Sequence, residues 1–252
     1  MTLSGEKEIR YVGSKNKLSK DLAPIIQSYI NDKTEGYLEP FVGGANMIDK
    51  IKCKKRIGCD IHKQLIALLQ YAQEHENELP ERILEEEYKT VQANKEDYPD
   101  WYLGLVGFCA SFGAKYFGGY ARDSKSDNSG KWSAGAIRNL KKQLPNIKDV
   151  KFVNADFNAL PLDKIKNYVI YCDIPYRGTT KYVTETFPYE DFYEWVKAAS
   201  VHNTVLISEY SMPDDFTCIW QKEVKTLLDS NKDKNDEKNI RIEKLFTYKN
   251  QG

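Results

Sequence analysis

The chain has 252 residues with 37 basic and 37 acidic side chains, so its formal net charge is zero. Hydrophobic residues make up 41% and charged residues 29%, which is the composition of an ordinary folded protein and excludes a disordered or membrane-embedded chain. Because the overall charge offers no long-range attraction to an acidic polymer, any nucleic-acid partner requires a local basic face.

The five cysteines are far apart and lack Cys-x-x-Cys spacing, which argues against a disulfide framework or a zinc site and favours a reducing cytosol. The first ten residues are polar, and no apolar run approaches the length of a membrane span. We therefore expect a cytoplasmic protein with no metal and no membrane partner. The length fits one α/β domain, with or without a smaller insertion.

The first motif is Gly13-Ser14-Lys15, and apolar residues follow it at helical spacing from about Lys17 to Ile30. A loop of this kind at the start of a helix offers N–H groups and an ammonium to an anion, although a solvated surface turn has the same composition. The Gly-x-x-x-x-Gly-Lys-Ser/Thr spacing of a Walker phosphate loop is absent.

A short strand and a glycine turn are predicted over residues 36–46, with a helix continuing through Ile51. Adjacent Gly43 and Gly44 let the backbone approach a ligand closely, and Glu39 can anchor a cationic group such as an amino-acid ammonium. A turn that serves only packing is the alternative. The Gly-x-Gly-x-x-Gly fingerprint is missing, so NAD is not the expected ligand.

Two further predicted strands lead to an acid. Asp60 ends the strand from Arg56 and lies about twenty residues after the glycine turn, where an acid binds ribose hydroxyls in nucleotide-binding α/β folds. It can also cap the helix that follows, and the two roles are compatible. In the strand at 150–157, Asp156 can accept a hydrogen bond from the amine of a bound adenine, and Phe157 can lie against its ring.

The composition changes between these two strands. A polar stretch over residues 74–99 includes Glu85, Glu86 and Glu87, which we expect on a solvated helix face. The segment after it combines aromatic and basic side chains, the mixture that phosphate contact and base stacking require. The candidates for nucleic-acid contact are Tyr116, Arg122, Lys125, Lys131, Trp132 and Arg138. The aromatic residues can equally form the core of a small helical subdomain.

The sequence Asp173-Ile174-Pro175-Tyr176 follows the apolar run 167–172 and is predicted to be a loop at the end of a buried strand. Ligands bind beyond the carboxyl ends of strands in open α/β sheets, and a carboxylate, a rigid proline and an aromatic ring suit a flat ring that bears an amine. An ordinary turn is the alternative. A helix at 189–199, a strand at 204–208 and a hairpin of strands 216–224 and 240–248 complete the chain.

Four pieces thus occur in order: Tyr11-x-Gly-Ser-Lys15, Glu-Pro-Phe-x-Gly-Gly, the strand-end Asp60, and Asp173-x-Pro-Tyr176. Together they resemble the Dam-like family of adenine-specific DNA methyltransferases over nearly the whole chain. The resemblance implies a Rossmann-like α/β methyltransferase fold with a mostly helical inserted target-recognition subdomain and a C-terminal β-hairpin. The implied boundaries are 1–80 for the first part of the methyltransferase domain, 81–145 for the insert, and 146–252 for the second part.

The resemblance also implies S-adenosylmethionine as the methyl donor. Carried over by position, Tyr11 and Lys15 border the donor pocket, and Asp173 lies where this pocket meets the catalytic loop. The methionine side of the donor is contacted by Glu39, Phe41, Gly43 and Gly44. Asp60 binds the ribose, and Asp156 and Phe157 bind the adenine. No metal is implied.

The implied catalytic residues are Asp173, Ile174, Pro175 and Tyr176. A target adenine must leave the duplex to be reached, after which Tyr176 would stack on it. Asp173 and the main-chain carbonyl of Ile174 would accept its amino hydrogens. The family loop usually has proline where this chain has Ile174, but isoleucine keeps the carbonyl, and Pro175 favours an extended conformation before it.

Double-stranded DNA is the implied substrate, in the cytosol of a bacterium or of a phage-infected host, with or without a partner endonuclease. Neither the recognition sequence nor the oligomeric state is predicted. Three alternatives remain: a methyltransferase acting on RNA or on a protein amide, a DNA-binding protein whose methyltransferase pocket has decayed, and an unrelated nucleotide-binding module.

Overall fold

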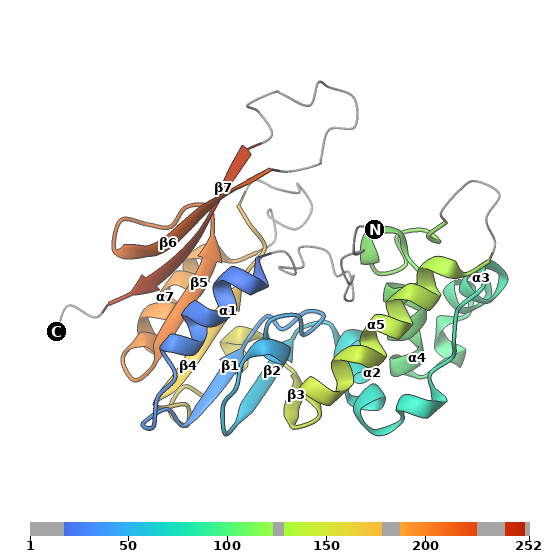
Figure 1. Ribbon diagram of the computed structural model, residues 1–252, viewed down its shortest axis with the longest axis horizontal. Helices are drawn as coiled ribbons and strands as arrows, with labels where there is room; N and C mark the ends of the chain where they lie inside the picture. The colour runs from blue at the N-terminus through green and yellow to red at the C-terminus, as the bar shows by residue number, and fades with distance from the viewer. Residues whose placement is uncertain (1–17, 123–128, 178–186, 226–239, 250–252) are drawn as a thin grey trace, which may run out of the picture.

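A computed structural model of the protein describes residues 18–122, 129–177, 187–225 and 240–249, which form a mixed α/β fold around a seven-stranded sheet (Figure 1). The strands are β1 (Gly36–Glu39), β2 (Arg56–Asp60), β3 (Val150–Asn154), β4 (Tyr168–Asp173), β5 (Thr204–Glu209), β6 (Phe216–Lys225) and β7 (Ile240–Tyr248). Their order across the sheet is β3-β2-β1-β4-β5-β7-β6. The predicted Rossmann-like α/β class is therefore confirmed.

The longer helices of the described residues are α1 (Ser19–Ser28), α2 (Lys63–Glu74), α3 (Glu85–Ala93), α4 (Asp100–Gly104), α5 (Lys131–Ile147) and α7 (Tyr189–Ser200). Short turns of helix are η1 (Ile48–Lys50), η2 (Glu76–Glu78), η3 (Lys95–Asp97), η4 (Leu105–Cys109), η5 (Phe112–Ala114) and η6 (Phe157–Ala159). All of these helices fall short, in length or in apolar character, of what a membrane crossing requires.

The prediction of a helix that continues through Ile51 is wrong, because only the single turn η1 forms there. The guanidinium of Arg56 donates to the main-chain oxygens of Ile48 at 2.8 Å and Ile51 at 3.2 Å. The Ile48 oxygen also accepts the Ile51 N–H at 3.3 Å, which closes this single turn. The chain instead becomes extended at Ile51 and enters β2.

The sheet changes direction of growth between β1 and β4. The chain adds β2 and β3 on one side of β1, then returns to place β4 and β5 on the other side, with all four pairings parallel. In such sheets the crevice at the point of reversal is the preferred ligand site. The predicted hairpin is confirmed as β6 and β7, and β7 also pairs antiparallel with β5, so the hairpin extends the main sheet.

Apolar side chains cover both faces of the sheet, as expected for parallel strands. One face carries Tyr37, Val169, Tyr171 and Leu206, in a cluster with Leu22 and Ile26 of α1. The other carries Leu38, Ile170, Cys172 and Ile207, in a cluster with Phe192 and Val196 of α7. Figure 1 accordingly shows α1 and α7 on opposite faces of the sheet. These two layers hold the strand ends in fixed positions.

Helices α3, α4 and α5 lie between α2 and β3, largely within the insertion predicted at 81–145, and to one side of the sheet in Figure 1. The insertion is joined closely to α2. A Cβ atom added to Gly104 would lie 2.1 Å from the main-chain oxygen of Gln64, so α4 can approach α2 this closely only with glycine at that position. The insertion therefore shares a core with the sheet domain.

The expectation that Glu85 lies on a solvated helix face is wrong. The residue is 7% exposed. Its carboxylate accepts two hydrogen bonds from the guanidinium of Arg122, one of them from Nε at 3.0 Å. The ammonium of Lys89 lies 2.8 Å from the same carboxylate. A run of acids in sequence indicates a solvated face only when no distant cation reaches it. Here Arg122, 37 residues later, draws one of the three acids inward.

Gly104→Ala should destabilise the protein by about 1–3 kcal/mol, because the added methyl group overlaps the backbone of α2. Gly135→Ala is the matched control, since a Cβ there meets nothing within 4 Å and alanine favours helix by up to about 1 kcal/mol. Urea unfolding of both variants measures the difference. Equal stability of the two would contradict the close approach of α4 and α2.

Glu85→Gln should destabilise the protein at neutral pH but not at low pH. Arg122, and then Lys89, lower the pKa of Glu85 from 4.5 to about 2. Because the folded-state pKa is depressed, the stabilisation is present above the ordinary pKa and is lost as the pH falls toward 2. Urea unfolding between pH 7 and pH 2.5 should show the two curves converging. A constant difference across this range would contradict the ion pair.

Candidate active site

Two acids lie at the point where the sheet reverses. Glu39 ends β1 and Asp173 ends β4, and these strands are adjacent and parallel. Glu39 is 2% exposed and accepts a 2.7 Å hydrogen bond from the hydroxyl of Tyr37. Burial raises its pKa well above the ordinary value, and the charges of Asp49 and Asp173 raise it further. A site of this kind favours a cation, which would relieve the repulsion among the carboxylates.

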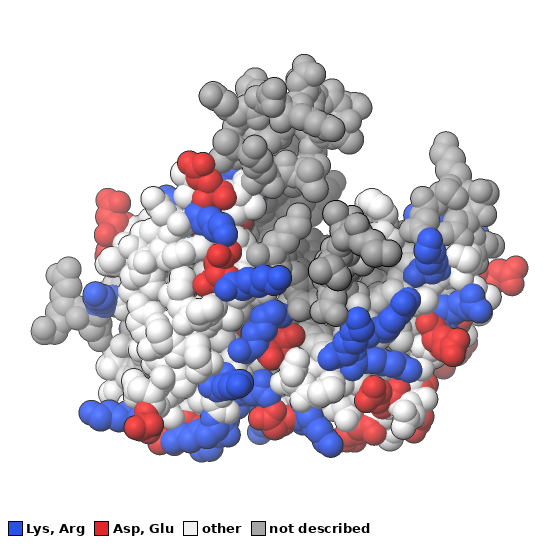
Figure 2. Space-filling view, viewed as in Figure 1, with Lys and Arg blue, Asp and Glu red and all other residues white. Residues whose placement is uncertain are grey.

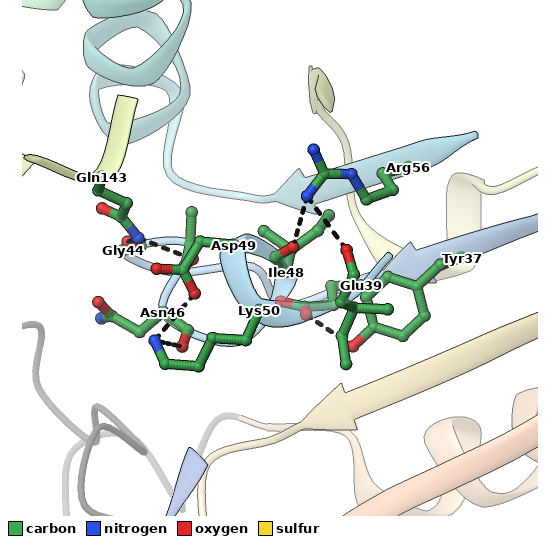
Figure 3. Close-up of polar contacts among 11 residues, drawn as sticks. Tyr37, Glu39, Gly44, Asn46, Ile48, Asp49, Lys50, Arg56 and Gln143 are labelled. Carbon is green, nitrogen blue, oxygen red and sulfur yellow. Dashed lines mark hydrogen bonds and ion pairs between the residues drawn. The ribbon is translucent and has the colours of Figure 1, made fainter. Parts of the chain in front are cut away.

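A tight turn separates Glu39 from Asp49 (Figure 3). The φ angle is 48° at Gly43 and 58° at Ala45, and the left-handed conformation costs a residue with a side chain about 1–2 kcal/mol. The turn is fixed from outside, because the amide of Gln143 in α5 donates to the oxygens of Gly44 at 3.1 Å and Ala45 at 2.8 Å. The insertion thus supports the turn directly.

The ammonium of Lys50 lies beside this turn. Figure 3 shows it bonded to the main-chain oxygen of Asn46 and to the carboxylate of Asp49, each at 3.0 Å. Its charge lowers the pKa of Glu39, opposing the stronger effect of burial. Among the described residues, no group of three His, Cys, Asp or Glu side chains could hold a metal ion.

Asp60 holds the other side of the turn. One carboxylate oxygen accepts from the Gly43 N–H at 3.1 Å, and the other accepts from the His62 N–H at 2.9 Å, just before α2. Burial raises the pKa of Asp60, and these two N–H groups oppose the increase. Since each oxygen accepts only one of these bonds, both retain a lone pair that could receive a hydroxyl. The capping and ribose interpretations remain compatible.

The end of β3 lies next to Asp60. Asn154 donates its amide to the main-chain oxygens of Asp60 at 2.9 Å and Ile61 at 3.0 Å, and Asp156 follows at the same edge of the sheet. One oxygen of Asp156 accepts from the Asn158 N–H at 2.9 Å. Ile61 is 72% exposed although it is apolar and adjoins Asp60. An exposed isoleucine at a strand end suits contact with the face of a flat ligand.

Phe157 is more enclosed than a ring-binding role requires. Its side chain is only 3% exposed, and its ring centroid lies 5.5 Å from that of Phe41 and 5.7 Å from that of Trp195. These contacts belong to the apolar cluster under α7. Little of the Phe157 ring is left for a ligand, and its contact with adenine stays a prediction.

The loop after β4 is fixed by residues from two later elements, α7 and β7. The Tyr189 hydroxyl donates to the Pro175 oxygen at 2.8 Å, and the Tyr176 hydroxyl donates to Glu243 at 3.0 Å. Tyr176 is 9% exposed, and Ile174, whose side chain lies in the apolar cluster under α7, is 3% exposed. The structure therefore places the predicted catalytic residues together at one end of β4.

The predicted nucleic-acid contacts fall into two groups. Tyr116 is half-buried against His62, with ring centroids 4.6 Å apart, and Arg122 is bonded to Glu85. Lys131 and Arg138 are exposed on α5, and Trp132 is half-buried beside them. The other predicted contact in the insert, Lys125, and the predicted pocket residues Tyr11 and Lys15 lie outside the described residues.

Basic side chains gather along α5. A groove there is lined by Pro80, Glu81, Arg82, Ser129, Lys131, Ala134, Ile137, Arg138 and Lys141. Figure 2 shows the blue side chains of Lys and Arg grouped where α5 lies in Figure 1. Phe112, 68% exposed, lies at one end of this surface with its ring 6.4 Å from Trp132. A nucleic-acid partner of a chain with no net charge would require a local basic surface of this kind.

Three site residues escaped the sequence analysis. Glu209 ends β5 as Asp60 and Asp173 end their strands, but the predicted strand stopped one residue short of it. Gln143 interrupts the apolar face of α5, and a polar residue in such a stripe is a detectable signal. Ile61 gave no signal, because its exposure depends on where the strand ends.

Comparison with known proteins gives a family match for part of the chain. Residues 11–105 match the model of the D12 class N6 adenine-specific DNA methyltransferase family. No curated protein matches the chain.

Two solved structures resemble the chain at low similarity. The first is a provisionally named methylase from Haemophilus influenzae, with a TM-score of 0.38 and 11% identity, covering 94% of this chain and 98% of that one. The second is a provisionally named methyltransferase from Thermoplasma acidophilum, with a TM-score of 0.24 and 13% identity, covering 46% of this chain and 54% of that one. Both scores are too low to support an argument.

The resemblance to adenine-specific DNA methyltransferases is confirmed by the family match over residues 11–105. These residues include the glycine turn and Asp60 and end before the loop at Asp173.

Proposed function

We propose that this protein transfers a methyl group from S-adenosylmethionine to the exocyclic amino nitrogen of an adenine flipped out of duplex DNA. The observation that carries the proposal is the pair of strand-end acids Glu39 and Asp173 at the reversal point of the sheet, beside a glycine turn held by Asp60. The family match over residues 11–105 supports the same chemistry.

The described residues fit the donor. S-adenosylmethionine, when bound, supplies a methyl group activated by a sulfonium, and it also carries an ammonium. Glu39 would bind the ammonium of the donor, whose positive charge would oppose the effect of burial and favour the ionised carboxylate. Asp60 would accept the ribose hydroxyls, Asp156 the adenine amine, and the exposed Ile61 would cover the face of the adenine. Tyr11, Lys15 and Phe157 are carried over from the resemblance.

The loop after β4 would hold the acceptor. The carboxylate of Asp173 and the main-chain carbonyl of Ile174 would accept the two amino hydrogens of the flipped adenine, and the Tyr176 ring would stack on its face. Both acceptors point the nitrogen lone pair at the methyl group, and the Asp173 charge stabilises the positive charge that grows on nitrogen during attack. Most of the rate would come from this fixed placement.

The basic surface along α5 would bind the DNA backbone. Lys131 and Arg138 are exposed cations suited to phosphate, and the adjacent rings of Phe112 and Trp132 suit stacking on bases. Arg122, Lys125 and Tyr116 remain predicted contacts of the same insertion. A partner endonuclease and a cytoplasmic location are further expectations that follow from the resemblance alone.

Labelled methyl transfer from S-adenosylmethionine to mixed-sequence duplex DNA tests the function. The unaltered protein should label adenine, and Asp173→Ala should lower the rate at least about 100-fold, because it removes the group that stabilises the transition state. Asp163→Ala, an exposed acid before β4, is the matched control and should retain full activity. Donor affinity is measured in parallel by calorimetry.

Each failure of this assay has a distinct meaning. Donor binding without transfer to DNA would indicate a decayed pocket or a different acceptor, which RNA and protein substrates would then distinguish. Absence of donor binding would leave the nucleotide-binding alternative. Transfer that survives Asp173→Ala would remove this residue from the mechanism.

Arg138→Gln should weaken binding to duplexes of any sequence and lower the slope of log affinity against log salt by about 1, as expected for one lost phosphate contact. Lys166→Gln is the control, because Lys166 is exposed and lies just before β4, at the opposite end of this strand from the loop. Fluorescence anisotropy at several salt concentrations measures both slopes. Equal slopes for the two variants would exclude the α5 surface.

A further inference from the structure

A buried carboxylate lies beneath the loop that follows β4. Glu209, the last residue of β5, has no exposed surface (0%). One of its oxygens accepts from the Arg177 N–H at 2.8 Å, and the other accepts from the Tyr210 N–H at 2.7 Å. The same side chain therefore joins the end of the catalytic loop to the residue that follows β5. A carboxylate that accepts two main-chain N–H groups is a strong anchor.

Tyr210 extends this anchor to the ring of Tyr176. The two rings meet edge to face, with centroids 4.5 Å apart and an interplanar angle of 88°. The hydroxyl of Tyr210 accepts a 3.2 Å hydrogen bond from Arg241, and that of Tyr176 donates to Glu243. Through the bonds to Arg177 and Tyr210, Glu209 thus fixes the backbone on both sides of the Tyr176 ring.

We propose that Glu209 is a positioning residue for methyl transfer, which sets the Tyr176 ring at the distance and angle that the acceptor base requires. This inference rests on the proposed function and adds to it a residue outside the loop. Glu209 makes no contact with the acceptor in this role. It acts by holding Arg177 N–H and Tyr210 N–H, so that the loop does not need to be ordered by the substrate.

Glu209→Gln is the discriminating variant because the amide has nearly the same shape as the carboxylate. Its oxygen can accept one of the two N–H groups, but its NH2 group is a donor and cannot accept the other. Packing around the side chain is therefore kept while one of the two anchoring bonds is lost. Glu190→Gln is the matched control: Glu190 also approaches Arg177, at 3.9 Å, but through the guanidinium and with its side chain 83% exposed.

The test compares the intact protein, Glu209→Gln and Glu190→Gln in three measurements: donor affinity by calorimetry, kcat for methyl transfer to duplex DNA, and amide hydrogen exchange at Arg177 and Tyr210. We expect Glu209→Gln to bind the donor within about twofold of the intact protein, to lose about 10- to 100-fold in kcat, and to exchange the Arg177 amide faster. Glu190→Gln should match the intact protein in all three.

Unchanged kcat in Glu209→Gln would overturn the proposal. So would a parallel loss of donor affinity and thermal stability, which would make Glu209 a general structural residue. If the intact protein transfers no methyl group to DNA, the proposed function fails. Hydrogen exchange then decides only whether Glu209 anchors the loop: unchanged protection of Arg177 in Glu209→Gln refutes the anchor, and selective loss of protection supports it.

Discussion

The parallel pairing of β1 with β4 is the constraint on which the rest of the site depends. It brings the ends of two buried strands together, and each strand ends in an acid, Glu39 or Asp173. Burying Glu39 costs free energy and raises its pKa, and the charges of Asp49 and Asp173 raise the pKa further. Apolar clusters on both faces of the sheet offset this cost. The arrangement is consistent with a site that is completed by a positively charged ligand.

The supports of this site come from distant parts of the chain. Asp60 holds Gly43 across 17 residues, and Gln143 holds Gly44 and Ala45 across nearly a hundred. The second contact is made by α5, whose exposed side carries Lys131 and Arg138. One helix therefore supports the turn at the proposed donor site and carries the proposed DNA surface.

The sequence predicts local features of this protein well and distant contacts poorly. Apolar runs that end in an acid predicted β2 and β4 and the positions of Asp60 and Asp173, because buried parallel strands carry little besides apolar residues. The helix predicted after the glycine turn forms only the single turn η1, after which the chain is extended at Ile51. Glu85 was misplaced because its partner, Arg122, lies 37 residues away. Partners at such separations leave no periodic signal.

The loop Asp173–Arg177 shows how rigidity can come from outside a motif. Ile174 lacks the fixed φ angle that a proline would impose, so its own backbone restrains the loop less. The restraint is supplied instead at three consecutive residues, by Tyr189 on Pro175, Glu243 on Tyr176 and Glu209 on Arg177. These partners belong to α7, β7 and β5, which all follow the loop in the chain. The C-terminal third of the chain therefore both extends the sheet and fixes the loop at the end of β4, which explains why the loop motif alone could not reveal its supports.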